Sequence, residues 1–234
     1  MPLPLPADPS GSATAAPSTA GEILRPALLL WLVVEVGWAC YFQLLALVPW
    51  RSDYELAYLV LYELAYFAVC GAVFWFVRRD AEARRVFAPM APRVLELCLL
   101  IALAAASMLW LWDGIVLAHA RDDTVSPIGL EYGMGLPWWA SILTSAVAPA
   151  LFEEWMCRGL LLQRFRAVMP LGYAIAVQAM LFAMMHRDSV MTLSHFAFGC
   201  VAGVLRVVAG GLWPCMLLHF GWNAYLVLLV YGLV

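Results

Sequence analysis

The sequence lacks several features that water-soluble proteins share. It contains no lysine, and charged residues make up only 12% of its 234 positions, whereas a soluble domain has about 25%. Hydrophobic residues make up 65% of the chain, which leaves too little polar surface to cover a soluble body of this size. The composition therefore excludes a soluble globular domain and indicates a protein of the lipid bilayer.

Two further absences concern partners and cofactors. The chain has no basic tract and a formal net charge of −3, so we expect no nucleic-acid partner. It also has no Cys-x-x-Cys pair or other metal-ligand spacing of cysteines, so we expect no cofactor held by them. We interpret the six cysteines as small buried hydrophobic residues: Cys40, Cys70, Cys98, Cys157, Cys200 and Cys215.

Long apolar runs fill most of the chain. Residues 1–22 are rich in Pro, Ala and Ser, and we expect a disordered lead-in there, followed by a single transmembrane helical domain over residues 23–234. About 20 apolar residues cross a bilayer core, and a backbone in hydrocarbon must pair its own polar groups, which favours helices. The sequence therefore predicts an all-α polytopic membrane bundle of seven transmembrane helices: Leu28–Val48, Leu56–Val77, Val94–Leu117, Trp138–Leu162, Leu171–Met185, Leu193–Ala209 and Leu212–Val234.

The placement of arginine predicts the orientation of these helices. Cytoplasmic loops carry an excess of positive charge, and a cytoplasmic N-terminus puts nine arginines on inner flanks and three on outer flanks, with Arg158 left out as intramembrane. Basic residues that are all arginine, together with abundant alanine, suggest a GC-rich prokaryotic genome. We therefore expect a bacterial inner membrane protein whose N-terminus is cytoplasmic.

Ionisable residues inside these apolar runs carry most of the information, because each costs about 2.5–3.5 kcal/mol in a membrane helix. The densest group lies in the fourth run. Glu154 and Arg158 are four residues apart, which predicts an ion pair on one helix face. Glu153 points about 100° away around the helix and has no local partner, so it is a candidate general base. The alternative is that all three residues form a cluster of polar contacts between helices that has only a structural role.

Two later runs contain the other polar candidates. His186 ends the fifth run, and His219 and Asn223 lie four residues apart on the last one. An imidazole and a carboxamide on one face can stabilise an oxyanion, although they can also form hydrogen bonds between helices. Together with a carboxylate, these residues are what hydrolysis of a peptide bond by activated water requires.

A helix contact is also predicted in the sixth run. Gly199 and Gly203 have the small-xxx-small spacing that favours close packing of membrane helices. His195 precedes them, and a hydrogen bond between helices is favoured for it over a place in the site.

The depths of the polar residues raise a geometric question. At about 1.5 Å of rise per residue, His219 lies about 9 Å into its run from Trp213, whereas His186 lies about 22 Å into its run from Leu171. One active site needs a common depth. Tilted helices, or a fifth helix that begins in water near Pro170, would satisfy that need.

The three motifs, taken in order, resemble those of a known family. Glu-Glu-x-x-x-Arg at 153–158, Phe-x-x-x-His at 182–186 and His-x-x-x-Asn at 219–223 are similar to the motifs of the CPBP family. That family includes CAAX-prenyl endopeptidases of the Rce1 type, bacteriocin-processing and immunity proteins, and other intramembrane glutamic proteases. The resemblance covers residues from about 140 to 225, so it implies nothing about the first 130 residues.

The resemblance implies a role for each matching position. Glu153 would be the catalytic base, and His186 would help to hold and polarise the attacking water. His219 and Asn223 would form the oxyanion hole, and Glu154 would support the site together with Arg158. The substrate would be a membrane-associated protein or a peptide precursor. The family commonly has eight transmembrane helices, one more than the apolar runs show.

Three other interpretations compete with this one. One Glu and two His are also the ligand set of a hydrolytic zinc site, so zinc is the rival to a mechanism without a cofactor. Intramembrane Glu, His and Arg also occur in transporters and proton relays, although here they cluster in one patch and no inverted repeat is evident. A non-catalytic scaffold or immunity protein could keep the same residues for structural reasons.

Overall fold

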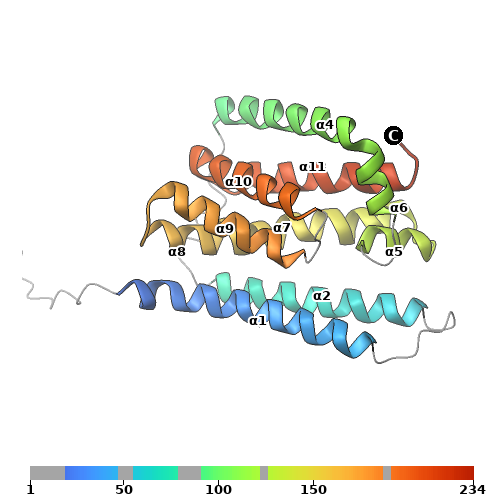
Figure 1. Cartoon of the computed structure of the whole chain (residues 1–234), viewed down its shortest axis with the longest axis horizontal. Helices are drawn as coiled ribbons and strands as arrows, with labels where there is room; N and C mark the ends of the chain where they lie inside the picture. Colours follow the sequence, from blue (N-terminus) through green and yellow to red (C-terminus); the bar gives the residue numbers. More distant parts are fainter. Residues whose placement is uncertain (1–18, 47–54, 79–90, 122–125, 187–190) are drawn as a thin grey trace, which may run out of the picture.

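Helices make up the regular structure of every part of the chain that the computed structural model describes, namely residues 19–46, 55–78, 91–121, 126–186 and 191–234. Helices α1 (Ala20–Ala46) and α2 (Glu55–Val77) lie together on one side of the molecule (Figure 1). Helix α4 (Pro92–Ala120) lies on the opposite side, next to α11 (Trp213–Val230), and the remaining helices lie between these two sides. The all-α prediction is confirmed for the described residues.

The fourth apolar run folds as five helical segments that follow one another without a break. They are α6 (Trp138–Ser141), the π-helix η3 (Ile142–Val147), α7 (Ala148–Glu154), the π-helix η4 (Trp155–Leu161) and α8 (Leu162–Arg166). π-Helical turns are rare and frequently occur at functional sites. Both of these turns flank the pair of glutamates that the sequence analysis singles out.

A short helix that the sequence analysis did not predict precedes this run. Helix α5 (Pro127–Gly133) begins after Ser126, whose hydroxyl accepts a hydrogen bond from the amide of Gly129 at 3.2 Å. A serine cap followed by proline at the first helical position is a strong start signal. The connection between the third and fourth runs is therefore partly helical.

The described helices include two that are long and apolar enough to cross a membrane by length and composition. They are α10 (Thr192–Ala209) and α11, while α9 (Leu171–Met185) and the segment Leu64–Trp75 of α2 are shorter apolar helices. Each of the seven expected runs lies largely within a helix or, for the fourth run, an unbroken series of helical segments. The number of membrane spans stays a prediction.

Helix α1 begins earlier than the apolar pattern predicts. The backbone amide of Thr19 donates to the Glu22 carboxylate at 2.8 Å, and the amide of Glu22 donates to the Thr19 hydroxyl at 3.3 Å. This reciprocal pair is a capping box, which satisfies two amides at the start of a helix. Residues 20–22 of the expected lead-in are therefore helical, and its residues 1–18 lie outside the described part.

Helices α9 and α10 form a closely packed hairpin. A Cβ atom built at Gly199 would lie 2.8 Å from the Cβ and 2.9 Å from the Cα of Ala179, and one at Gly203 would lie 3.0 Å from Ile175. The predicted close packing at these glycines is confirmed. The hairpin stops short of the end of the molecule at which α5 and α6 lie (Figure 1), so His186, at its tip, reaches Glu153 in the middle of the α6–α8 series.

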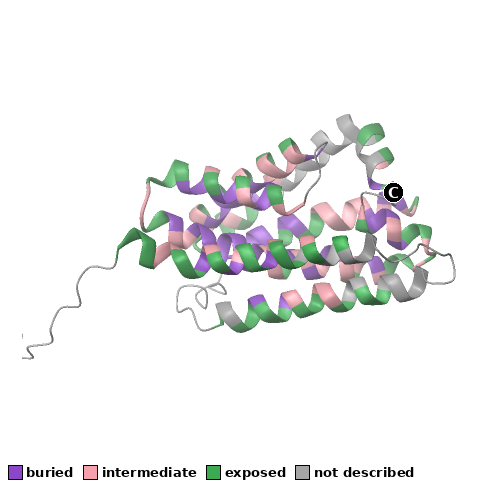
Figure 2. Cartoon of the chain, turned by 60° about the horizontal axis from the view of Figure 1, so that its bottom comes forward, coloured by how far each residue is buried: buried purple, intermediate pink, exposed green. Residues whose placement is uncertain are grey.

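Burial separates the inner helices from the outer pair (Figure 2). Buried polar residues occur on α5 and on the helices from α6 to α11, and they include Glu154, Arg158 and His219. By contrast, α1 and α2 expose many large apolar side chains, as expected of surfaces that face lipid: Leu29, Leu32, Val33, Val36, Val60, Leu61, Leu64, Phe67, Phe74 and Trp75. The fold thus places Glu154, Arg158 and His219 among its buried residues.

Candidate active site

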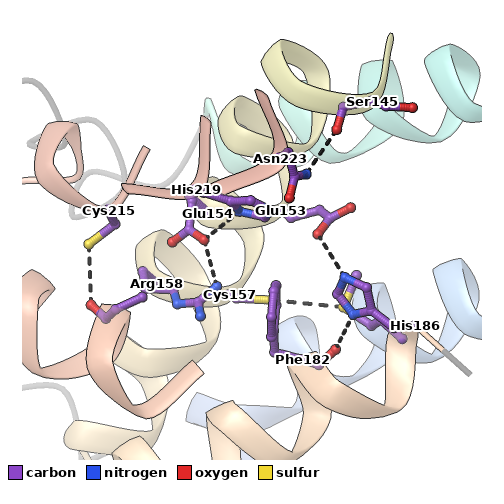
Figure 3. A network of polar contacts seen from close by, with 12 residues as sticks. Ser145, Glu153, Glu154, Cys157, Arg158, Phe182, His186, Cys215, His219 and Asn223 are labelled. Atoms are coloured by element: carbon purple, nitrogen blue, oxygen red, sulfur yellow. Dashed lines mark hydrogen bonds and ion pairs between the residues drawn. The ribbon is translucent and has the colours of Figure 1, made fainter. Parts of the chain in front are cut away.

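A fully buried ion pair lies at the centre of the candidate site. Nη1 of Arg158 donates to Oε1 of Glu154 at 2.8 Å, and both side chains are 0% exposed. The pair predicted from the spacing of four residues therefore forms. The same Oε1 also accepts a hydrogen bond from Nδ1 of His219 at 2.8 Å (Figure 3). Glu154 thus links two helices and fixes the orientation of the His219 ring.

The remaining face of the Arg158 guanidinium is covered by aromatic rings. Its Cζ lies 4.3 Å from the ring centroid of Phe182 and 5.7 Å from that of Phe198. Both distances are within the range of a cation–π interaction, which is strongest when the cation is removed from water. The two rings stack on each other at 5.7 Å. They offset part of the cost of burying a charge whose Nε and Nη2 have no hydrogen-bond partner in the described part.

Glu153 and His186 form a separate and more open pair. Oε2 of Glu153 lies 3.8 Å from Nε2 of His186, and their side chains are 18% and 25% exposed. This distance is too long for a direct hydrogen bond. Nδ1 of His186 lies 3.0 Å from the carbonyl oxygen of Phe182. A carbonyl only accepts, so Nδ1 carries the proton and, in the neutral ring, Nε2 keeps a lone pair on the side of Glu153.

Asn223 bonds to a backbone carbonyl in the π-helix η3. Nδ2 of Asn223 donates to the backbone oxygen of Ser145 at 2.8 Å. Because a carbonyl only accepts, the orientation of the amide is fixed, and Asn223 keeps one further N–H to donate.

His219 and Asn223 therefore lie on one helix as predicted, but each has its own partner. His219 donates to Glu154 and Asn223 donates to Ser145. All six residues singled out in the sequence lie in the network drawn in Figure 3. The sequence does not show that the two side chains are held separately, because both partners come from another helical series.

Two further residues lie near these groups. Glu131, in the connection between the third and fourth apolar runs, is not among the residues singled out in the sequence, but its side chain is buried, and its Oε1 accepts from the hydroxyls of Thr144 at 2.6 Å and Ser145 at 3.0 Å. The capping pattern Ser-Pro before α5 was the available signal for a helix there. His195 also lies at the site: its ring stacks on that of His186, with centroids 3.9 Å apart.

A cavity of about 40 Å³ opens beside Glu153. Val34 of α1 and Val69, Cys70 and Val73 of α2 form one wall, and Met185 of α9 lies among the other lining residues. The lining is mostly apolar, but it includes Tyr66 of α2 as well as Glu153. The carboxylate therefore stands at the edge of a mostly apolar space between the outer helix pair and the inner helices.

Metal ligation was tested against the same geometry. Within the described ranges, no group of three or more His, Cys, Asp or Glu side chains is arranged to hold a metal ion. The six cysteines are free, and four of them are buried, whereas Cys40 is exposed and Cys200 is intermediate. Glu153 and His186 could supply two ligands to an ion, and His219, whose Nδ1 is bound to Glu154, would have Nε2 to offer as a third.

Comparison with known proteins supports the resemblance found in the motifs. Residues 135–225 match the family model described as type II CAAX prenyl endopeptidase Rce1-like. This segment includes all six predicted site residues, whereas α1, α2 and α4 lie outside it. No curated protein and no solved structure matches the chain. The chain is thus similar to the Rce1-like family over less than half of its length, and two of its described helices are long and apolar enough to cross a membrane.

Proposed function

We propose that this protein is an intramembrane endopeptidase of the glutamic type, which hydrolyses a peptide bond in a membrane-associated protein or peptide precursor. The observation that carries the proposal is the pair formed by Glu153 and His186, two groups 3.8 Å apart that are only partly exposed. The family match gives the reaction class, and the pair supplies the chemistry that such a reaction needs.

The attacking water would be held by two acceptors. With its proton on Nδ1, His186 presents a lone pair at Nε2, and the ionised Glu153 presents another at Oε2. One water molecule can donate a hydrogen bond to each of them, which leaves its own lone pairs available to a carbonyl carbon. As its oxygen bonds to that carbon, one proton passes to Glu153. Glu153 then gives the proton to the amine when the C–N bond breaks.

The oxyanion would be stabilised from α11. Asn223 has one N–H beyond the one that it donates to Ser145, and this group can donate to a developing negative charge. His219 uses Nδ1 on Glu154, so it can donate through Nε2 only as an imidazolium. The bond to Glu154 fixes the orientation of that ring. Glu154 and Arg158 thus support the oxyanion hole through His219.

The substrate and location follow from the family and the composition. A CAAX protein with a prenyl group is one substrate class, and in a prokaryote a peptide precursor or a sorted membrane protein fits better. Arginine placement favours a bacterial inner membrane and a cytoplasmic N-terminus. Fusing a reporter active only in the cytoplasm to the N-terminus tests that orientation, and an inactive reporter would contradict it.

The decisive experiment compares two neighbouring glutamates. Purified protein in detergent or liposomes is given a library of peptides, and cleavage is followed by mass spectrometry. We expect Glu153→Gln to lower kcat by at least about a hundredfold, because a general base contributes about 10²–10⁴, with thermal stability close to that of the wild type. Glu154→Gln should mainly lower stability and yield, because it removes a buried charge from Arg158. Equal activity of the Glu153 variant and wild type would contradict the proposal.

A second experiment separates this mechanism from the zinc rival. We expect activity to survive prolonged treatment with a strong chelator, because the proposed chemistry uses side chains and water alone. Metal analysis of the treated protein serves as the control that any bound ion was removed. Activity that disappears with the chelator and returns with zinc would instead assign Glu153 and the histidines to a metal site.

A further inference from the structure

His195 belongs to none of the three motifs, yet its side chain lies against His186. It stands in the first turn of α10, where its backbone amide donates to the Met191 carbonyl at 2.9 Å. Side chains of a helix lean towards its N-terminus, and α10 begins shortly after His186 ends α9. The two imidazole rings stack with centroids 3.9 Å apart and an angle of 21° between their planes.

The His186 ring sits where its own helix ends. His186 is the C-cap residue of α9, and helix ends fray. Its Nδ1 lies 3.0 Å from the carbonyl oxygen of Phe182, and the Phe182 ring meets its ring edge-on, with centroids 4.7 Å apart. Both contacts come from the preceding turn of the same helix, so they would be lost together if that turn frayed. The stack with His195 adds a contact from a second helix.

The helix that provides this contact is itself held in place. Gly199 lies one turn after His195 on the same face of α10, and a Cβ there would lie 2.9 Å from the Cα of Ala179 on α9. One turn further on, a Cβ at Gly203 would lie 3.0 Å from Ile175. Because the two helices already touch along this face, α10 presents the His195 ring at a fixed place.

The stacked geometry also limits what His195 can do. The N–H group and the lone pair of an imidazole form hydrogen bonds along the ring plane, so two rings that lie face to face pass no proton directly to each other. The stack instead fixes the plane of the His186 ring. That plane matters because Nε2 of His186 lies 3.8 Å from Oε2 of Glu153 (Figure 3).

We propose that His195 is a positioning residue of the proposed active site, which holds the His186 ring so that Nε2 faces Glu153 and the attacking water. The effect on the reaction rate rests on the proposed endopeptidase function, whereas the effect on the ring does not. A His186 ring without this support rotates, and Nε2 moves away from the water. A misplacement of about 1 Å in an active site can lower the rate by about a hundredfold.

The first test replaces His195 with side chains that fill the same space. A phenyl ring can stack on an imidazole, whereas leucine has no flat face. We expect His195→Phe to keep kcat within about threefold of the wild type, and His195→Leu to lower it by about ten- to a hundredfold with little change in KM. Leu193→Ala is the matched control, because Leu193 lies in the same turn and is 75% exposed.

The comparison of the two side chains decides whether the ring matters. If His195→Leu folds poorly, His195→Met replaces it, because methionine adapts to irregular gaps. A variant without a flat side chain that matches His195→Phe in kcat would show that His195 only fills space, which would contradict the proposal.

The second measurement does not depend on catalysis. The chain has four histidines, so labelling histidine with an NMR-active nitrogen isotope gives few imidazole signals, and His186→Gln identifies those of His186. We expect the wild type and His195→Phe to carry the His186 proton on Nδ1. In His195→Leu the bond to the Phe182 carbonyl should be partly lost, and a mixture of both tautomers should appear.

This measurement keeps the two proposals separable. If the tautomer changes in His195→Leu while no protein hydrolyses any peptide, the positioning role stands and the endopeptidase function fails. If cleavage depends on Glu153 while the His186 signals and kcat are the same in His195→Phe and His195→Leu, the positioning role is overturned and the function stands.

Discussion

The inner helices and the outer helix pair are both apolar, but they use polar residues in opposite ways. Between α7 and α11, Glu154, Arg158 and His219 are buried and bonded to one another. On α1, the hydrogen bonds at Thr19 and Glu22 are exposed and cap the start of the helix, and Glu35, which has one buried carboxylate oxygen, is only partly buried. The comparison teaches that hydrophobic content identifies helices that suit a membrane, whereas a buried and bonded cluster of charges marks the helices that carry the proposed site.

The largest difference between the two regions is expected for arginine. Arg158→Ala leaves Glu154 buried without its ion pair, and loss of one partner from a buried pair costs about 3–5 kcal/mol. Arg25→Ala, at an exposed position of α1, should change the free energy of unfolding by less than about 0.5 kcal/mol. Thermal unfolding in detergent, followed by tryptophan fluorescence, measures both. Similar melting temperatures for the two variants would mean that the inner pair contributes no more than a surface charge.

A smaller difference is expected for glycine. Gly199→Ala forces a Cβ to within 2.9 Å of the Ala179 backbone, so α10 must move away from α9. Overpacking of this kind lowers the free energy of unfolding by about 1–3 kcal/mol, and we expect a loss at the upper end of that range. Peptide cleavage should also slow, because α9 carries His186. Gly71→Ala on α2 meets no atom within 4 Å and should be neutral or stabilising by up to about 1 kcal/mol. Melting temperature and kcat are the two readouts, and a stabilised Gly199 variant would contradict the close packing.

The smallest difference is expected for two glutamates that accept hydrogen bonds near helix ends, Glu131 of α5 and Glu22 of α1. Glu131→Ala leaves the Ser145 hydroxyl without its carboxylate acceptor, which costs about 1–2 kcal/mol. The rate of cleavage should fall as well, because the Ser145 carbonyl orients Asn223. Glu22→Ala breaks the capping box of α1, which should lower the free energy of unfolding by about 0.5–1 kcal/mol. It should leave kcat unchanged.

Combining Glu131→Ala with Asn223→Ala sharpens this last comparison. If Glu131 affects the rate through Asn223, the double variant should be no slower than Asn223→Ala alone. Additive losses in kcat would show that Glu131 acts through general stability and does not position the oxyanion hole.

Much of the site could be predicted because its contacts within helices repeat at a fixed spacing. The pair of Glu154 and Arg158 follows from a separation of four residues, and close packing at Gly199 follows from the small-xxx-small spacing. The bond from His219 to Glu154 spans 65 positions, and no spacing predicts it. The burial of Glu131 was missed for the same reason, since its partners belong to another helix.

The amino-acid sequence determined that the chain is helical and apolar, and which few polar residues have to be accommodated, because hydropathy and helical periodicity are local properties. Packing decided how those residues meet. The hairpin of α9 and α10 ends near the middle of the α6–α8 series and so places His186 beside Glu153. The packing of α11 against η3 brings Asn223 to the Ser145 carbonyl. Such contacts depend on where separate helices cross, and the packing of the whole bundle sets the position of each crossing.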